Sequence, residues 1–187
     1  MAVRAIIGII TAMLMSMAAS AQVTSAPVTL VDIRAAMVGK WKGQLEYRDY
    51  QADRWFGLPV NVSIEMMRDG LTLVRHADFD DGPKTGIVTI TGVALFEPKS
   101  SREQSASFRK GRDAELDVAT LQLTRAEAID RWTIEAIRDG KDNNRAARIR
   151  ETTTRNGATM VTLKEVDFLD DSGEAWLTRN RTTLTRE

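Results

Sequence analysis

The sequence predicts an all-β fold: a single up-and-down antiparallel β-barrel of roughly ten strands, with a short N-terminal helix capping one end. Two observations lead to this prediction. From residue 41 onward apolar and polar residues alternate with a period of two, which is typical of antiparallel strands with one buried face. Turn signals rich in Gly, Asn, Asp and Pro then divide the chain into segments of strand length. A meander of this many strands exposes two edges, and closure into a barrel removes them.

The first residues have the pattern of a leader. Arg4 provides a positive start, an apolar run follows, and Ala19-Ser20-Ala21 offers the small-x-small pattern that a signal peptidase cleaves. The run is short for a membrane-spanning helix, although an uncleaved anchor is the alternative. We therefore expect a signal peptide over residues 1–21, a flexible N-terminus over 22–28, and a lipocalin-like barrel domain over 29–187. The expected location is periplasmic or secreted.

Composition and charge argue against several classes of binding partner. The chain carries 26 basic and 26 acidic residues with no basic block, which argues against nucleic acid and anionic membranes. It contains no cysteine, so disulfides, thiol chemistry and cysteine lipidation are excluded. Charges such as Lys42, Glu46 and Arg48 on the outward face of the first strand argue against membrane insertion as a barrel. The oligomeric state stays open.

The N-terminal helix is predicted over residues 29–39. Leu30, Ile33 and Met37 have helical spacing, Thr29 is the expected N-cap, and Gly39 is the expected residue after the C-cap.

After Gly39 the strands follow in one unbroken series. Their expected ranges are 41–50, 58–67, 71–80, 86–96, 103–109, 115–124, 129–138, 146–155, 158–168 and 175–186. In the sixth strand the apolar phase changes between Val118 and Leu121, which predicts a β-bulge.

A short helix followed by Gly39-Lys40-Trp41, together with an arginine-rich last strand, resembles the lipocalin and calycin superfamily. The resemblance implies that Trp41 closes the barrel floor against a basic residue of the last strand, and Arg179, Arg181 and Arg186 are the candidates. The lipocalin Thr-Asp-Tyr signature is absent, and a strand count nearer ten than eight leans toward the related fatty-acid-binding and nitrobindin-like barrels. An ordinary core position for Trp41 is the alternative.

In a meander every second hairpin faces the same way. Residues 51–57, 81–85, 110–114, 139–145 and 169–174 should therefore share the end opposite the helix. The first of these loops presents Trp55 and Phe56, which predict either a ligand portal at the rim or a minor core folded over it.

Charged residues on apolar strand faces give the strongest functional signal. Arg75, Arg138 and Glu151 each share a face with apolar residues, and a charge inside a barrel must be paired or must meet a ligand. An internal Arg75–Glu151 bridge is one outcome, and a ligand with an apolar body and an anionic end is the other. The predicted ligand-contacting residues are Tyr47, Trp55, Phe56, Arg75, Trp132, Arg138 and Glu151.

Candidates for catalysis are few. His76 is the only histidine, and the strand phase places it on the outer face, so neither a zinc site nor a haem ligand is expected. Ser105 and Ser107 have no histidine beside them in the sequence to act as a base. We expect no catalytic residue, metal or cofactor. The favoured function is an exported carrier or sensor for a small apolar or amphipathic molecule. The alternatives are a cell-envelope interaction protein with a filled barrel and, third, an enzyme using paired carboxylates.

Overall fold

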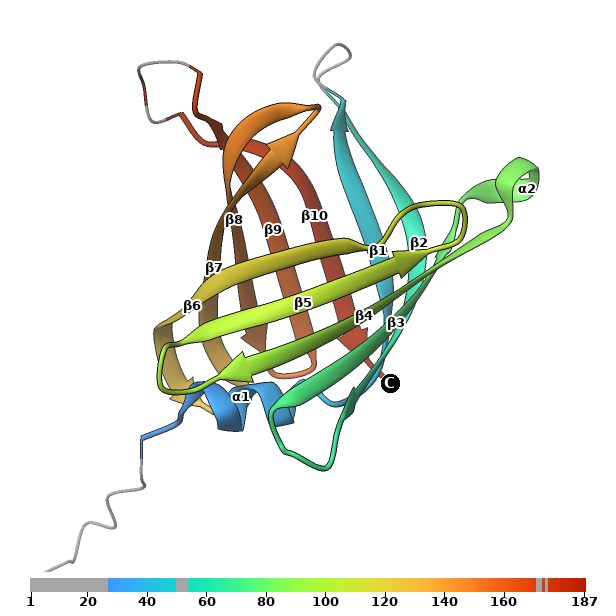
Figure 1. The fold of residues 1–187 in the computed structure, drawn as a ribbon. Helices are drawn as coiled ribbons and strands as arrows, with labels where there is room; N and C mark the ends of the chain where they lie inside the picture. The colour runs from blue at the N-terminus through green and yellow to red at the C-terminus, as the bar shows by residue number, and fades with distance from the viewer. Residues whose placement is uncertain (1–26, 50–53, 171–172, 174) are drawn as a thin grey trace, which may run out of the picture.

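The computed structural model describes residues 27–49, 54–170, 173 and 175–187. Ten antiparallel strands in the described residues close into one up-and-down barrel, and helix α1 precedes the first strand (Figure 1). Consecutive strands are neighbours, and β1 pairs with β10 to complete the ring. The predicted fold class is confirmed. The predicted signal peptide and most of the expected flexible N-terminus lie outside the described residues.

All ten predicted strands are present, with ends within about four residues of the predicted ranges, whereas the short helix α2 lies where a hairpin loop was expected. In chain order they are α1 (Leu30–Ala36), β1 (Gly39–Asp49), β2 (Arg54–Met66), β3 (Thr72–Asp80), α2 (Gly82–Thr85), β4 (Ile87–Glu97), β5 (Arg102–Arg109), β6 (Glu115–Ala128), β7 (Arg131–Asp142), β8 (Arg145–Asn156), β9 (Thr159–Phe168) and β10 (Leu177–Arg186). The described part of the chain contains no helix with the length and apolar character needed to cross a membrane.

Two predictions about the ends of elements are wrong. Trp55 and Phe56 were expected in a rim loop, but they belong to β2 because they pair with Arg48 and Tyr47 along the β1–β2 hairpin. Gly39 was expected just after the helix C-cap. Met37 is that cap, and Gly39 instead opens β1 with a φ of 138°, a conformation that favours glycine.

The bulge expected between Val118 and Leu121 is also absent. β6 pairs with β5 up to Thr120 and with β7 from Thr120 without a shift in that stretch, and its irregularities come after Leu123. The apolar phase changes because Leu116 and Val118 point outward, where they are 77% and 47% exposed.

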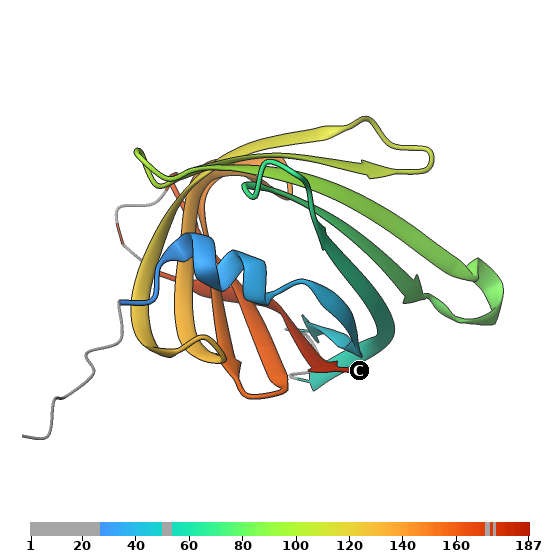
Figure 2. The ribbon, with the colours of Figure 1, turned by 90° about the horizontal axis from the view of Figure 1, so that it is seen from below.

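Helix α1 lies across one end of the barrel (Figure 2). Thr29 caps it: the backbone N–H of Asp32 donates to Thr29 Oγ1 at 3.2 Å, and the Asp32 carboxylate accepts from the Thr29 backbone N–H at 2.9 Å. Hydrogen bonds that the Asp32 carboxylate accepts from the Thr29 hydroxyl, at 2.6 Å, and from the Thr29 backbone N–H hold the pKa of Asp32 below its ordinary value. The helix buries Ile33 completely against the inward-facing strand residues. It therefore closes this end.

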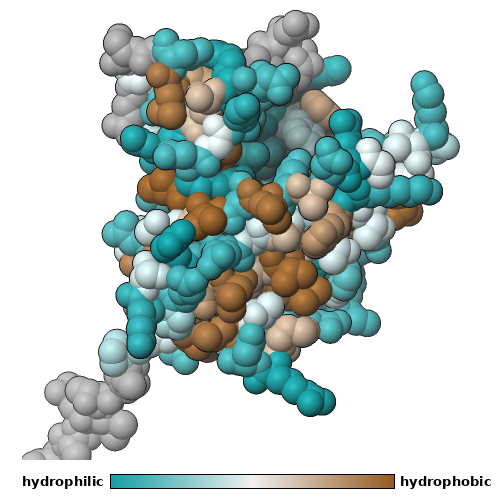
Figure 3. Space-filling view, viewed as in Figure 1, coloured by the Kyte–Doolittle hydropathy of each residue, from teal (hydrophilic) through white to brown (hydrophobic). Residues whose placement is uncertain are grey.

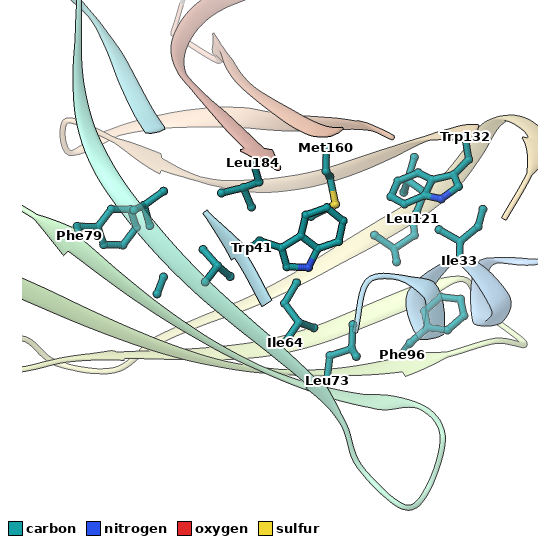
Figure 4. Close-up of a cluster of buried hydrophobic side chains, with 14 residues drawn as sticks. Ile33, Trp41, Ile64, Leu73, Phe79, Phe96, Leu121, Trp132, Met160 and Leu184 are labelled. Carbon is teal, nitrogen blue, oxygen red and sulfur yellow. The ribbon is translucent and has the colours of Figure 1, made fainter. Parts of the chain in front are cut away.

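The main core is concentrated toward the closed end. Figure 4 shows Trp41 and Trp132 among its side chains, and each is only 1% exposed. The indole Nε1 of Trp41 donates to the Met37 carbonyl at 2.9 Å, which fixes the ring beneath the end of α1. Burial of large aromatic groups at this end leaves the middle of the barrel to smaller and polar side chains.

Candidate ligand site inside the barrel

Two neighbouring cavities within the barrel are lined by described residues. The first, of about 250 Å³, lies next to α1 and is lined largely by apolar residues, including Ile64, Leu73, Leu121 and Ile134. The second, of about 390 Å³, is more polar and is lined by side chains that include Thr162, Lys164, Asn180 and Thr182. Arg75, Glu151 and Thr153 line both cavities. The interior thus offers an apolar compartment and a polar compartment that meet at these three residues.

Arg75 projects inward from β3, as its strand phase predicts. Its register partners on β2 and β4 are Ile64 and Gly92, so no carboxylate lies directly beside it. Within the described residues Arg75 has neither an ion pair nor a hydrogen bond. Burial lowers the pKa of its guanidinium, and the charge of Glu151 opposes this effect. Because arginine stays protonated in proteins, Arg75 is a cation in the cavity wall without a partner in direct contact.

Glu151 pairs with Arg138 instead. Nη1 of Arg138 lies 3.0 Å from Glu151 Oε1, and its Nε lies 3.2 Å from Asp117 Oδ1. The expected ion pair between Arg75 and Glu151 is therefore wrong, because Glu151 pairs with Arg138. Arg138 and Glu151 are two residues out of direct register on the β7–β8 hairpin, which is a diagonal neighbour distance that long side chains reach.

Lys164 was missed in the sequence. It projects from β9 into the polar cavity, opposite Glu151 on β8 and Asn180 on β10. The structure gives Lys164 no ion pair among the described residues. A register shift between Thr178 and Asn180 on β10 lies beside it, and such irregularities reorient side chains. The alternation of Met160, Thr162, Lys164 and Val166 along β9 was the signal that could have placed it inside.

An ion pair that the sequence analysis also missed connects α1 to the barrel. Arg34 is 5% exposed, forms an ion pair with Glu103 of β5, and donates to the carbonyls of Leu71 at 3.3 Å and Ala94 at 3.1 Å. Its guanidinium also lies 5.3 Å from the centre of the Phe96 ring. Burial raises the pKa of Glu103, and Arg34 opposes that rise. Because Arg34 and Glu103 also line the apolar cavity, this pair forms part of its wall.

The predicted aromatic residues at the open end separate into two groups. Tyr47 and Phe56 stack with their ring centres 5.5 Å apart, and Tyr47 lines a rim cavity of about 90 Å³ with Phe79 and Arg109. Burial raises the pKa of the Tyr47 phenol. Trp55 contacts the guanidinium groups of Arg48 and Arg181 and lines none of these cavities.

Trp132 also does not line the cavities. It is a core residue whose Nε1 donates to the Ile129 carbonyl at 3.0 Å. It was predicted from its strand face, which is correctly inward, but Trp132 packs in the buried core with Ile33 of α1 and is not among the residues that line these cavities.

Of the three arginines expected near Trp41, Arg186 is the one that contacts it, with its guanidinium 5.4 Å from the ring centre. Arg155, which the sequence did not indicate, lies 5.3 Å from the same ring. Arg181 instead pairs with Glu46 at 2.8 Å, and Arg179 pairs with Asp142 at 2.9 Å. The floor contact therefore combines the last strand with β8.

His76 lies on the outer face of β3, as its phase predicts. It is exposed, and its Nδ1 is 3.0 Å from the Thr91 hydroxyl.

Comparisons with known proteins support the fold alone. No family model matches the sequence, and no curated protein matches it. Among solved structures, the crystal structure of Rv2717c from M. tuberculosis is similar, with a TM-score of 0.55 and 15% sequence identity. The similarity covers 83% of this chain and 97% of that chain. At this level of identity the shared property is the barrel.

Proposed function

We propose that the barrel binds a small amphipathic molecule whose anionic group contacts Arg75 and Lys164. The observation that carries this proposal is Arg75, a guanidinium in the cavity wall without an ion-pair partner in the described residues. Removing a cation from water costs free energy that only a partner recovers. A ligand carboxylate or similar anion would supply that partner and form charge-assisted hydrogen bonds.

The balance of charge in the middle of the barrel supports a monoanion. Among the described residues, Arg75, Arg138 and Lys164 are cations there, and Asp117 and Glu151 are the carboxylates that accompany them. The Arg34–Glu103 pair, which also lines the apolar cavity, is neutral as a pair. Three cations against two carboxylates leave one positive charge in excess. A ligand with one negative charge would neutralise this layer.

The apolar compartment supports the rest of the ligand. Its volume of about 250 Å³ is bounded largely by apolar residues and lies against α1. Together with the polar compartment it falls in the range of roughly 300–1,000 Å³ that is usual for ligand pockets. An apolar body in this compartment would place the anionic group at the layer of Arg75 and Glu151.

Calorimetric titration with laurate tests the proposal. Arg75→Met and Lys164→Met should each weaken binding about tenfold or more, because each removes a charged hydrogen-bond partner. Lys42→Met is the matched control, since Lys42 alternates out of phase with the inward Trp41 and Gly43 and should leave affinity unchanged. If the unmodified protein bound neither laurate nor other amphipathic anions, the carrier function would be rejected.

An interaction function is the second candidate, and the outer wall favours it. Leu95, Phe108, Leu116 and Val118 on β4, β5 and β6 are all at least 40% exposed, and apolar residues gather on this face in Figure 3. Apolar patches of this kind can mark protein contacts. Native mass spectrometry of the purified protein separates the candidates: a bound small molecule favours the carrier, and a bound protein favours the interaction function.

A further inference from the structure

The pairing between β6 and β7 covers only part of the length of the two strands. These strands pair from the closed end up to Thr120 and Ile137. Beyond that point Glu115–Ala119 of β6 have register partners only on β5, and Arg138–Asp142 of β7 have them only on β8. Both strands continue while diverging, as Figure 1 shows. We call these two stretches, residues 115–119 and 138–142, which have no register partners on each other, the β6–β7 notch.

A charged bridge takes the place of backbone pairing across the notch. Arg138 on one side contacts Asp117 on the other at 3.2 Å and also contacts Glu151 at 3.0 Å. The Arg138 side chain is 14% exposed, whereas those of Asp117 and Glu151 are 37% and 36% exposed. Solvent therefore reaches both carboxylates, and ion pairs screened in this way open at low cost.

The notch lies beside the candidate ligand site. Glu151, the inner partner of Arg138, lines both interior cavities. On the outer side, Leu116 and Val118 form an exposed apolar lip on β6. An amphipathic anion approaching here would meet apolar side chains first, then the Arg138 guanidinium, and then Arg75 in the cavity.

We propose that the β6–β7 notch is a side entrance to the barrel and that Arg138 is its gate. The closed state is the Asp117–Arg138–Glu151 bridge, and the open state lacks the Arg138–Asp117 contact. This inference rests on the proposed function, since an entrance matters only if a ligand enters. The competing route is the rim cavity beside Tyr47 and Phe79.

Cysteine labelling tests the entrance without any ligand, because the chain has no cysteine of its own. Ala136→Cys places a thiol in the wall of the apolar cavity. Its rate of reaction with the neutral reagent 2-hydroxyethyl methanethiosulfonate reports access to the interior, because an uncharged reagent does not respond to the charges that the variants remove. Adding Asp117→Asn or Arg138→Ala should accelerate labelling about twofold to fivefold, the change expected when a solvent-screened ion pair worth up to about 1 kcal/mol no longer holds the bridge closed.

Arg150→Ala is the matched control. Arg150 is on β8 near Glu151 but pairs outside the notch, with Glu165 at 2.8 Å, so its loss should leave the labelling rate unchanged. Asp117→Asn is the less disruptive of the two variants, because it leaves the Arg138–Glu151 ion pair in place. Melting temperatures show whether any acceleration reflects unfolding.

Equal labelling rates in the Asp117, Arg138 and Arg150 variants would overturn the gate, and acceleration only in Tyr47→Ala would place the entrance at the rim. Failure of the carrier function has a different signature. The labelling result would still hold, while laurate binding to the unmodified protein would be absent.

Discussion

Trp41 contacts parts of the chain that are far apart in the sequence. Its ring lies near the guanidinium groups of Arg155 on β8 and Arg186 on β10, and its Nε1 donates to the last turn of α1. The side chain is 1% exposed. Removing it would leave a large cavity where the helix, the first strand and the last strand meet.

Trp41→Ala should therefore lower the free energy of unfolding by about 3–5 kcal/mol, as for a large aromatic side chain removed from a core. Trp55→Ala should cost far less, because Trp55 contacts arginines on the wall instead of the core. Urea denaturation of both variants measures the difference. Comparable losses would show that Trp41 does not have a special role in closing the floor.

Arg75→Met should leave stability nearly unchanged. If Arg75 were the partner of Glu151, its removal would strand a buried carboxylate and cost about 3–5 kcal/mol. Glu151 has Arg138 at 3.0 Å, so it keeps its ion pair in the variant. Thermal unfolding of Arg75→Met in the absence of ligand measures this. A large loss would mean that Arg75 stabilises the empty barrel and would count against a ligand-binding role.

The sequence predicted which way Arg75 points but not what it meets. Alternation along one strand determines the face, whereas contacts across the barrel depend on the stagger of strands that are distant in the chain. The Arg138–Glu151 pair lies within a single hairpin and could have been predicted from the sequence, because the turn at Asn143 and Asn144 determines the register of β7 and β8.

At the level of elements, α1 shows the same limit. Periodicity and capping predicted the helix and its buried residue Ile33. They did not predict that Arg34, on the next position, would be buried too. Its burial depends on how the helix rotates over the barrel end, where Glu103 and two strand carbonyls receive it.

Arg34→Met should destabilise the protein by about 3–5 kcal/mol at neutral pH, because it leaves Glu103 buried without its cation. Arg34→Met combined with Glu103→Leu should recover much of this loss, since no charge then remains unpaired. Urea denaturation of the single and double variants measures the recovery. No recovery would show that the carbonyl contacts of Arg34 matter more than the ion pair.

The loss in Arg34→Met should shrink on acidification. Burial raises the pKa of Glu103 in the folded protein above its ordinary value of 4.5, and without Arg34 the rise is larger. The folded state then binds the proton more tightly than the unfolded state, so the contribution of this group to stability increases as pH falls toward 4.5 and is lost as pH rises through the folded pKa. A pH series of melting curves, with the double variant as control, tests this direction.

For the whole molecule, closure explains why the fold was predictable while the site was only partly so. Ten strands with a period of two and short turns have few ways to remove their edges, so the barrel follows from local patterns. The cavity depends on volumes summed over many strands. The alternation of apolar and polar residues indicates neither the position of Trp132 along the barrel axis nor the point at which β6 and β7 diverge.

Export of the barrel from the cytoplasm remains a prediction, because it depends on residues that precede the described part of the chain. We expect cleavage after Ala21 and release of the barrel domain, because Arg4, the apolar run and Ala19-Ser20-Ala21 together form a signal-peptidase substrate. N-terminal sequencing of exported material should read from Gln22. Ala19→Asp together with Ala21→Asp should block processing while leaving the barrel sequence untouched, since both small residues at the cleavage site are replaced. Exported protein that retains Met1 would show that the segment is an anchor, and the barrel would then act tethered to a membrane.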